Sequence, residues 1–228
     1  MNRIRIIGLF SSTILISLAN IGFTGENEMI RLPAPRYDSG FSVEKAILER
    51  RSVREYSGEP LSIEELAQLL WACQGITSPS GYRAVPSAGA LYPLEIYVVV
   101  KNVTDLPAGI YHYRPERKMG EHHIELVEPG DYSSALCNAA LGQDCIRNAA
   151  LNIVIASVTQ RTAVKYGGRA ERYVYLEAGH AAQNVCLQAQ PFGLGVVTIG
   201  AFHDQRVKDV TQADGDPVYI LSIGRKPQ

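Results

Sequence analysis

The first chemistry that the sequence offers is a dense set of hydrogen-bond donors near residue 50. Arg50, Arg51 and Arg54 surround Ser52 within five residues. Guanidinium groups match the geometry of phosphate oxygens, and a hydroxyl adds a further contact. The run therefore predicts a phosphate-binding segment. A solvated basic turn is the alternative interpretation of the same residues.

A second stretch could bring backbone groups very close to a flat or anionic ligand. It consists of small residues bounded by two prolines: Pro86, Ser87, Ala88, Gly89, Ala90 and Leu91, with Pro93 after them. Almost no side chain stands in the way of its N–H groups and its one hydroxyl. It leads into residues 94–100, whose β-branched and aromatic side chains predict a buried strand. An ordinary tight turn before a core strand is the alternative.

Other combinations of residues exclude several classes of site. His122 and His123 occupy a predicted polar turn without an H-E-x-x-H motif or a nearby cysteine pair, so the sequence predicts no metal site. Gly193 and Gly195 begin a dinucleotide fingerprint, but Thr198 stands at the third glycine position and no strand precedes them. No phosphate-binding G-x-x-x-x-G-K-[ST] loop and no G-x-S-x-G motif is present.

The overall composition indicates what kind of protein positions these residues. The 228 residues are 46% hydrophobic and 20% charged, with a formal net charge of -1, which is typical of one globular domain. The scattered lysines and arginines predict no nucleic-acid partner. The four cysteines show no C-x-x-C spacing and are expected to be structural thiols. A disulfide between Cys137 and Cys145 stays open if the domain is exported.

The amino-terminal residues have a different composition. Arg3 and Arg5 precede an uncharged run over residues 6–23, and Glu26 and Glu28 follow it. This pattern predicts a signal peptide or membrane anchor over residues 1–28, followed by a linker over 29–41 and a folded domain over 42–228. The charge asymmetry favours a membrane-anchored or exported protein, with a cytoplasmic location as the alternative.

The folded domain mixes helical and strand patterns. Ser62 and Glu65 form a capping box at the start of a helix that Gly75 ends. The longest helical pattern runs from residue 169 to 190, and its Ala and Gly residues predict close packing against another helix or a second subunit. His180 on this helix is expected to be packed rather than catalytic. Further elements are predicted at residues 43–50, 109–114, 124–127, 131–141, 151–158, 193–202, 204–211 and 218–224.

Together these motifs resemble the nitroreductase family. The resemblance is carried by RRSVREY at residues 50–56, PSAGALYP at 86–93, EAGHAAQN at 177–184, GLGVVTIGAF at 193–202 and the terminal IGR. It covers roughly residues 42–225. Within the family the chain looks most like the SagB-type dehydrogenases, which include azoline oxidases that form thiazole and oxazole rings in modified peptides.

The resemblance implies an α+β nitroreductase-like fold, with a central mixed sheet flanked by helices, in a homodimer that binds FMN at the subunit interface. By position, the residues implied to hold the phosphate and ribityl end are Arg50, Arg51, Ser52, Arg54 and Arg225. Those implied to line the flavin ring are Pro86, Ser87, Ala88, Gly89, Ala90, Leu91, Thr198, Ile199 and Gly200.

SagB-type azoline oxidases also carry a Lys-Tyr pair, which matches Lys165 and Tyr166 here. The chemistry is reasonable, because hydride removal from a substrate carbon requires that a proton leave a neighbouring atom, and either side chain could accept it. A polar loop at a helix start is the alternative.

The resemblance therefore implies an FMN-dependent oxidoreductase that transfers hydride between a small-molecule or peptide azoline substrate and the flavin. One alternative is a nitro or quinone reductase with NAD(P)H as electron donor. The other is a membrane-anchored flavin-binding module without turnover.

Overall fold

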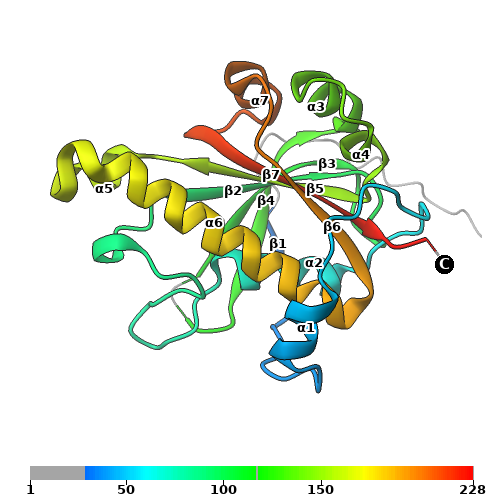
Figure 1. Cartoon of the computed structure of the whole chain (residues 1–228), viewed down its shortest axis with the longest axis horizontal. Coiled ribbons are helices and arrows are strands. Elements are labelled where there is room, and N and C mark those ends of the chain that lie inside the picture. The colour runs from blue at the N-terminus through cyan, green and yellow to red at the C-terminus, as the bar shows by residue number, and fades with distance from the viewer. Residues whose placement is uncertain (1–28, 117, 228) are drawn as a thin grey trace, which may run out of the picture.

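The computed structural model describes residues 29–116 and 118–227, which form one antiparallel sheet with helices on both faces (Figure 1). The predicted signal peptide or anchor lies outside these residues. Within the described part of the chain, no helix has both the length and the apolar character that crossing a membrane requires.

The sheet has the strand order β1-β4-β3-β2-β5-β7-β6. Its strands are β1 (Met29–Arg31), β2 (Leu94–Val100), β3 (Gly109–Pro115), β4 (His122–Pro129), β5 (Leu151–Ser157), β6 (Leu194–Ile199) and β7 (Asp216–Arg225). The predicted α+β class is confirmed, but the predicted mixed sheet is wrong. All neighbouring strands among the described residues run antiparallel, and the parallel contacts there are two isolated bridges. The mixed sheet was implied by the resemblance alone; here the consecutive strands β5 and β6 do run in the same direction, but β7 lies between them and pairs antiparallel with both.

Different helices pack on the two faces of the sheet. They are α1 (Val43–Glu49), α2 (Ile63–Gln74), α3 (Ser133–Ala139), α4 (Asp144–Asn148), α5 (Gln160–Tyr166), α6 (Ala170–Gln188) and α7 (Asp204–Thr211). One core contains residues of α2 and α6, and the other contains residues of α3, α4 and α7. All four cysteines are buried free thiols, so the disulfide left open by the sequence is not formed.

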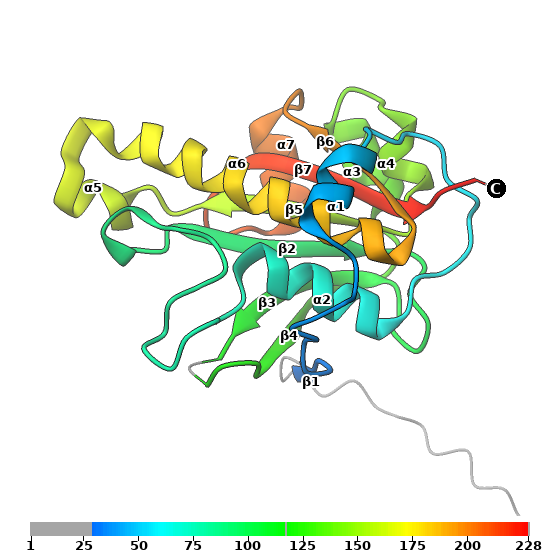
Figure 2. The ribbon, with the colours of Figure 1, turned by 60° about the horizontal axis from the view of Figure 1, so that its bottom comes forward.

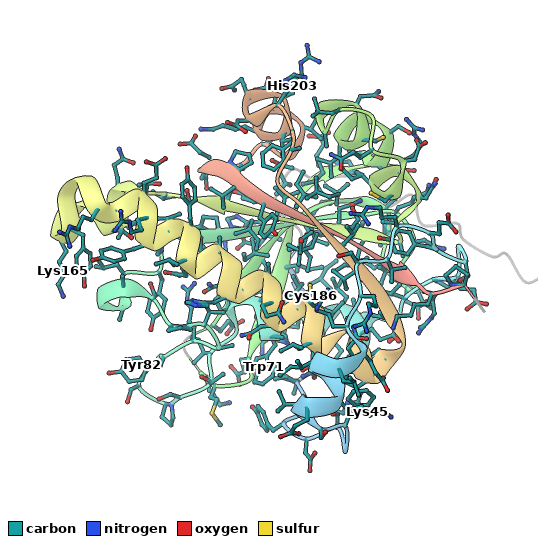
Figure 3. The ribbon with its side chains drawn as sticks, in the orientation of Figure 1. Lys45, Trp71, Tyr82, Lys165, Cys186 and His203 are labelled. Carbon is teal, nitrogen blue, oxygen red and sulfur yellow. The ribbon has the colours of Figure 1, made fainter. Side chains whose placement is uncertain are left out.

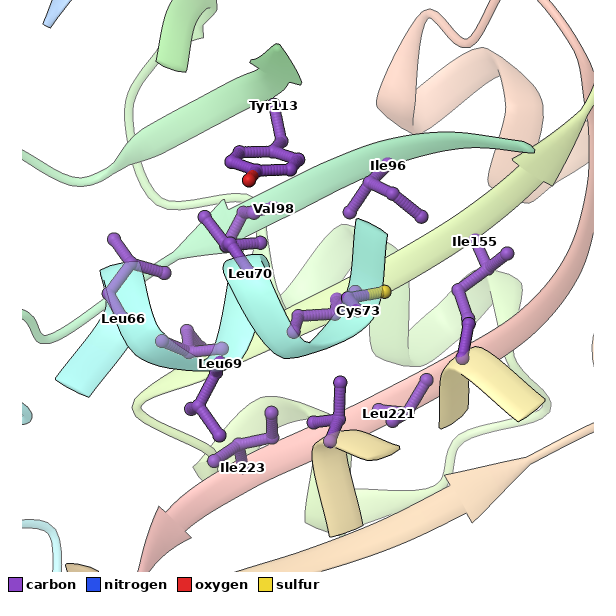
Figure 4. Close-up of a cluster of buried hydrophobic side chains, with 14 of the residues drawn as sticks. Leu66, Leu69, Leu70, Cys73, Ile96, Val98, Tyr113, Ile155, Leu221 and Ile223 are labelled. Carbon is purple, nitrogen blue, oxygen red and sulfur yellow. The ribbon is translucent and has the colours of Figure 1, made fainter. Parts of the chain in front are cut away.

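The amino-terminal end of α2 follows the prediction. The Ser62 hydroxyl accepts from the Glu65 N–H, and the Glu65 carboxylate accepts from the Ser62 N–H. The buried leucines of this helix share one core with residues of β2 and β7, and Figure 4 shows Leu66, Leu69 and Leu70 in this cluster with Val98, Leu221 and Ile223. Each fully buried leucine contributes roughly 1.5–3 kcal/mol, so this packing fixes the strand into which residues 86–93 lead.

Part of the predicted linker belongs to the sheet. Met29–Arg31 forms the edge strand β1 on β4, and the Leu32 N–H donates to the His122 carbonyl. His122 and His123, predicted in a turn, instead begin β4. The His122 ring lies 2.9 Å from both the Tyr113 hydroxyl and the Pro33 carbonyl, so its polar atoms are satisfied within the protein.

The long helix α6 runs diagonally along the molecule. Figure 2 shows α5 at its amino-terminal end and α1 toward its other end. Its residues Ala178, Ala181 and Ala182 are buried, and α6 packs closely on α2, as its small residues predicted. His180 is exposed rather than packed, because it projects about 200° around the helix from buried Ala178.

Candidate functional site

The arginine-serine run lies along the outer edge of β6. Ser52 forms a parallel bridge with Val196, and the Val53 N–H donates to the Val196 carbonyl at 3.0 Å. Gly195 makes this approach possible, because a Cβ there would lie 2.6 Å from a Val53 methyl group. The Tyr56 hydroxyl then reaches the Ser222 carbonyl on β7 at 2.9 Å. The run is therefore anchored at both ends to the sheet.

A pocket of about 130 Å³ opens beside this run, and we call it the Arg50 pocket. Its lining consists of Arg50, Ser52, Gly179, Ala182, Gln183, Cys186, Val196, Thr198 and Tyr219. The small residues of α6 leave the space, and the polar residues surround it with a guanidinium, three hydroxyls and an amide. This donor set suits a phosphate and the hydroxyls of an attached polyol.

Cys186 does not supply a reactive thiolate to this pocket. Burial raises the pKa of its thiol to about 11, and the nearby Arg50 charge only partly opposes that rise. The thiol is therefore neutral near pH 7, so the polar character of the pocket comes from the other residues.

The other predicted phosphate ligands lie elsewhere. The Arg51 guanidinium donates to the carbonyls of Leu48 and Arg50 at 2.9 and 2.8 Å. Arg54 is exposed and does not line the Arg50 pocket; its charge opposes the burial that raises the pKa of the Cys145 thiol.

Arg225 donates to Glu65 at 2.7 Å and to the Phe192 carbonyl at 3.3 Å, so it ties β7 to α2. Arg225 does not line the Arg50 pocket, and its acidic partner comes from a helix 160 residues earlier in the chain. Its role in holding the same phosphate as the arginine run stays a prediction.

The loop over residues 86–92 has a strained backbone. Gly89 has φ +66°, and the non-glycine residues Ala90 and Tyr92 have φ +54° and +47°. The left-handed conformation costs a residue with a side chain roughly 1–2 kcal/mol. The Tyr92 N–H donates to the Ser87 hydroxyl at 2.9 Å, and the Arg83 guanidinium lies 4.5 Å from the centre of the Tyr92 ring. Strain of this kind, maintained by surrounding contacts, is common at functional sites.

The predicted acid/base pair contacts this loop. A methyl group placed on Gly89 would lie 3.1 Å from the Tyr166 hydroxyl and 3.2 Å from the Lys165 amine. The Tyr166 ring meets the Tyr173 ring edge to face, with centroids 4.8 Å apart. The structure thus brings Lys165, Tyr166 and the small-residue loop into one group, which we call the Gly89 cluster.

The Arg50 pocket and the Gly89 cluster lie on different faces of α6. Glu177 is 3% exposed, and its carboxyl lies next to the Ser87 hydroxyl of the loop; burial raises its pKa, and the bond with Ser87 opposes that rise. Gly179, about 200° around the helix from Glu177, lines the pocket instead. Figure 3 shows Lys165 beyond the amino-terminal end of α6 and Cys186 near its other end. One chain therefore does not combine the two groups into a single slot.

The predicted ring-binding residues Thr198, Ile199 and Gly200 also point to different places. Thr198 lines the Arg50 pocket, and Gly200 is exposed just beyond it. The side chain of Ile199 is buried in the core on the other face of the sheet, so only its backbone could meet a ring.

The residues present fit one end of FMN. The Arg50 pocket offers donors for a phosphate and a ribityl chain, but its volume is too small for three fused rings. The ring would have to extend outside it, toward Gly200 and the exposed face of α6. That requirement agrees with the implied position of the flavin at a subunit interface.

Sequence reasoning missed several residues of these two groups. Gly179, Gln183 and Cys186 follow the spacing i, i+4, i+7, which places them on one helical face, so this pattern could have identified them. Glu95 and Arg161, which lie behind the Gly89 cluster, carry no sequence signal, because their pairing joins β2 to a helix 66 residues later.

Comparison with known proteins identifies relatives of this chain. A candidate nitroreductase of Methanocaldococcus jannaschii, MJ1384, is 42% identical over 184 residues, covering 81% of this chain and 91% of the relative. The microcin B17-processing protein McbC of Escherichia coli is 28% identical over 170 residues, covering 72% of this chain, and the chain spans 61% of McbC. This second relative agrees with the predicted resemblance to the SagB-type branch.

Comparison of the fold with solved structures also identifies nitroreductases. The crystal structure of a candidate nitroreductase from Ralstonia eutropha JMP134 is 28% identical and aligns with a TM-score of 0.75, covering 88% of this chain and 90% of that chain. The model of the Nitroreductase family matches residues 47–225. The chain belongs to the nitroreductase family, as its motifs predicted.

Proposed function

We propose that this protein is an FMN-dependent oxidoreductase that transfers hydride between the flavin and an organic substrate. The observation that supports this most directly is the Arg50 pocket, where Arg50, Ser52, Thr198 and Gln183 surround a space suited to a phosphate and a ribityl chain. Membership of the nitroreductase family supports oxidoreductase chemistry.

The complete site is proposed to form across a homodimer. The pocket and the Gly89 cluster lie on different faces of α6, so a second copy must supply one of them to each flavin. The same helix exposes the neighbouring side chains of Tyr175 and Leu176 by 55% and 54%, which gives a partner an apolar surface to cover. Pairing two such helices would bury these residues and place the loop of one protomer over the pocket of the other.

In this arrangement the residues of the chain perform separate tasks. FMN, when bound, supplies a carrier that accepts or donates a hydride. Arg50, Ser52 and Thr198 hold its phosphate and polyol, and the loop at Gly89 excludes water from one side of the ring. Lys165 and Tyr166 accept a proton from, or donate one to, the substrate atom next to the reacting carbon, which is general acid/base catalysis.

Two substrate classes follow from the relatives. McbC supports a peptide azoline, whose ring carbon would lose hydride while a neighbouring atom loses a proton. MJ1384 supports a stand-alone nitro or quinone reductase with NAD(P)H as donor, because this chain spans 91% of MJ1384 but only 61% of McbC. We regard the reductase as the second candidate.

The test begins with the purified full chain. A bound yellow chromophore, or uptake of added FMN at one per protomer, is expected. A protein that neither contains nor takes up FMN would contradict the proposal.

Anaerobic flavin reduction then separates the two substrate classes. Bleaching by NADPH alone identifies a reductase, and bleaching only by a thiazoline peptide identifies an oxidase. Flavin that binds but is reduced by neither donor would instead favour the module without turnover.

A further inference from the structure

Helix α5 carries Lys165 and Tyr166 but has little intrinsic support. It is seven residues long, its N-cap makes no side-chain hydrogen bond, and its only buried residue is Thr162. The Thr162 hydroxyl is itself buried without a hydrogen-bond partner, and Val164 is 89% exposed. Short helices without caps or apolar burial are marginal. Another contact must therefore set the position of α5 against the loop.

Arg161 provides that contact. It lies one turn before Lys165, so both side chains project from the same face of α5. Its guanidinium donates to the Tyr92 carbonyl at 3.1 Å, while Lys165 lies against Gly89 at the other end of the same loop segment. The edge of α5 that carries these two residues therefore runs alongside the strained residues 89–92.

The second partner of Arg161 is the nearly buried carboxylate of Glu95, at 2.5 Å. Glu95 is the second residue of β2, so it belongs to the central, fully buried strand. It also accepts from His112 at 2.8 Å and pairs with Arg114 at 3.5 Å. The His112 ring is in turn stacked on Tyr97, with centroids 4.2 Å apart. The anchor for Arg161 is thus fixed to the rigid centre of the sheet.

We propose that Glu95 and Arg161 are positioning residues that set the Lys165-Tyr166 pair against the Gly89 loop. Arg161 joins three parts of the chain at one point: β2 through Glu95, the strained loop through Tyr92, and α5 through its own backbone. This inference rests on the proposed catalytic role of Lys165 and Tyr166, and extends it to two residues that do not touch the reacting atoms.

The test compares three variants of the full-length holoenzyme. Arg161→Ala removes both contacts, and Arg161→Lys keeps a cation for Glu95 without the fork that reaches Tyr92 as well. Arg114→Ala is the matched control, because it removes a partner of Glu95 that comes from β3 and whose other ion pair is with Glu125 on β4. Bound FMN and the unfolding temperature are measured first, so that the comparison uses folded, loaded protein.

Turnover is measured with NADPH and menadione and with a thiazoline peptide. Displacing a catalytic group by about 1 Å can cost on the order of 100-fold in rate. We expect Arg161→Ala to lower kcat by 10- to 100-fold with KM changed less than threefold. Arg161→Lys should recover part of this loss, and Arg114→Ala should stay within threefold of the parent.

A second readout follows the position of Lys165 without using activity. The lysines are methylated with ¹³C, and the Lys165 resonance is assigned by its loss in Lys165→Ala. We expect this resonance to move in Arg161→Ala and to stay in Arg114→Ala. Glu95→Gln gives an independent route to the same displacement if Arg161→Ala does not fold.

The outcomes separate this inference from the proposed function. Unchanged kcat and an unmoved resonance in Arg161→Ala would overturn the inference. A moved resonance with unchanged kcat would support the positioning contact and contradict the catalytic role of Lys165. Loss of activity with an unmoved resonance would also overturn it, because Arg161 would then act without displacing Lys165.

Discussion

The Arg50 pocket and the Gly89 cluster lie along the same helix but are built in opposite ways. The pocket is formed by regular elements, with its polar run fixed to β6 and β7 and its space created by small residues of α6. The cluster consists of a strained loop and a short helix; Arg161 of the helix bonds to the loop and pairs with Glu95 of the sheet. A binding site benefits from rigid elements, whereas chemistry often uses strained backbone. The contrast suggests that binding and turnover can be disrupted separately.

The largest expected effect comes from the acid/base pair. Lys165→Ala should lower turnover by roughly 100- to 1,000-fold, because a positioned general acid/base typically contributes 10²–10⁴-fold. Bound FMN should be unchanged, because the proposed phosphate and polyol contacts come from the Arg50 pocket, which Lys165 does not line. Steady-state kinetics and flavin absorbance measure the two quantities, with Lys118→Ala on the exposed β3-β4 turn as control. A parallel loss of FMN would remove the distinction between the two regions.

Glu95, which holds Arg161 of the cluster, should also contribute to the free energy of unfolding. Burial raises the pKa of Glu95, but hydrogen bonds from His112 and Arg161 outweigh it and hold the pKa at about 2, against an ordinary 4.5. This lowering corresponds to on the order of 3 kcal/mol of stability. The contribution is complete above the ordinary pKa and is lost as the pH falls through about 2.

Urea unfolding of Glu95→Gln checks this value. The variant should be less stable than the parent at pH 7, and the difference should shrink between pH 4.5 and pH 2. The neighbouring substitution Glu125→Gln, at a more exposed partner of Arg114, serves as control. A difference between parent and Glu95→Gln that does not change with pH would show that the ion pairs do not stabilise the fold.

Two arginines of the same motif should differ in their effect on FMN binding. Arg50→Ala should weaken FMN binding by roughly 10- to 100-fold, because hydrogen bonds to charged groups contribute about 1.5–3 kcal/mol. Arg54→Ala removes the same charge from a residue that does not line the pocket and should weaken binding less than threefold. Titration of the apoprotein with FMN, followed by quenching of flavin fluorescence, gives both constants. Equal losses would mean that both arginines reach the phosphate.

The smallest effect is expected at Gly89. Its φ of +66° and the nearby Lys165 and Tyr166 atoms make an alanine there strained, at a cost of about 1 kcal/mol in the free energy of unfolding. Gly168, two residues after Tyr166, has open space around it, so Gly168→Ala should change stability by less than about 0.5 kcal/mol. Denaturant midpoints compare the two. A neutral Gly89→Ala would indicate that the loop adapts freely.

Local patterns predicted most of the elements. The capping box at Ser62 and the apolar run at residues 94–100 both gave the observed bounds within a residue, because their signals lie within the element itself. The strand Met29–Arg31 was predicted as linker, because three residues at a sheet edge carry no pattern and form only through their partner β4.

The site shows the same division between local and long-range information. The motif at residues 50–54 predicted phosphate donors, but only the fold shows that Arg50 and Ser52 line the pocket and that Arg51 and Arg54 do not. The pairs Arg225-Glu65 and Arg161-Glu95 join residues 160 and 66 positions apart. Contacts of this kind depend on how the strands are ordered, which short motifs do not encode.

The placement of residues 29–54 has a consequence for how the protein resists aggregation. This segment covers both borders of the sheet: β1 shields β4 at one border, and the residues around Ser52 shield β6 at the other. Unpaired strand borders are templates for association between chains. If FMN binds to Arg50 and Ser52 as proposed, it would also hold this segment on β6, and loss of FMN would then promote aggregation as well as loss of activity.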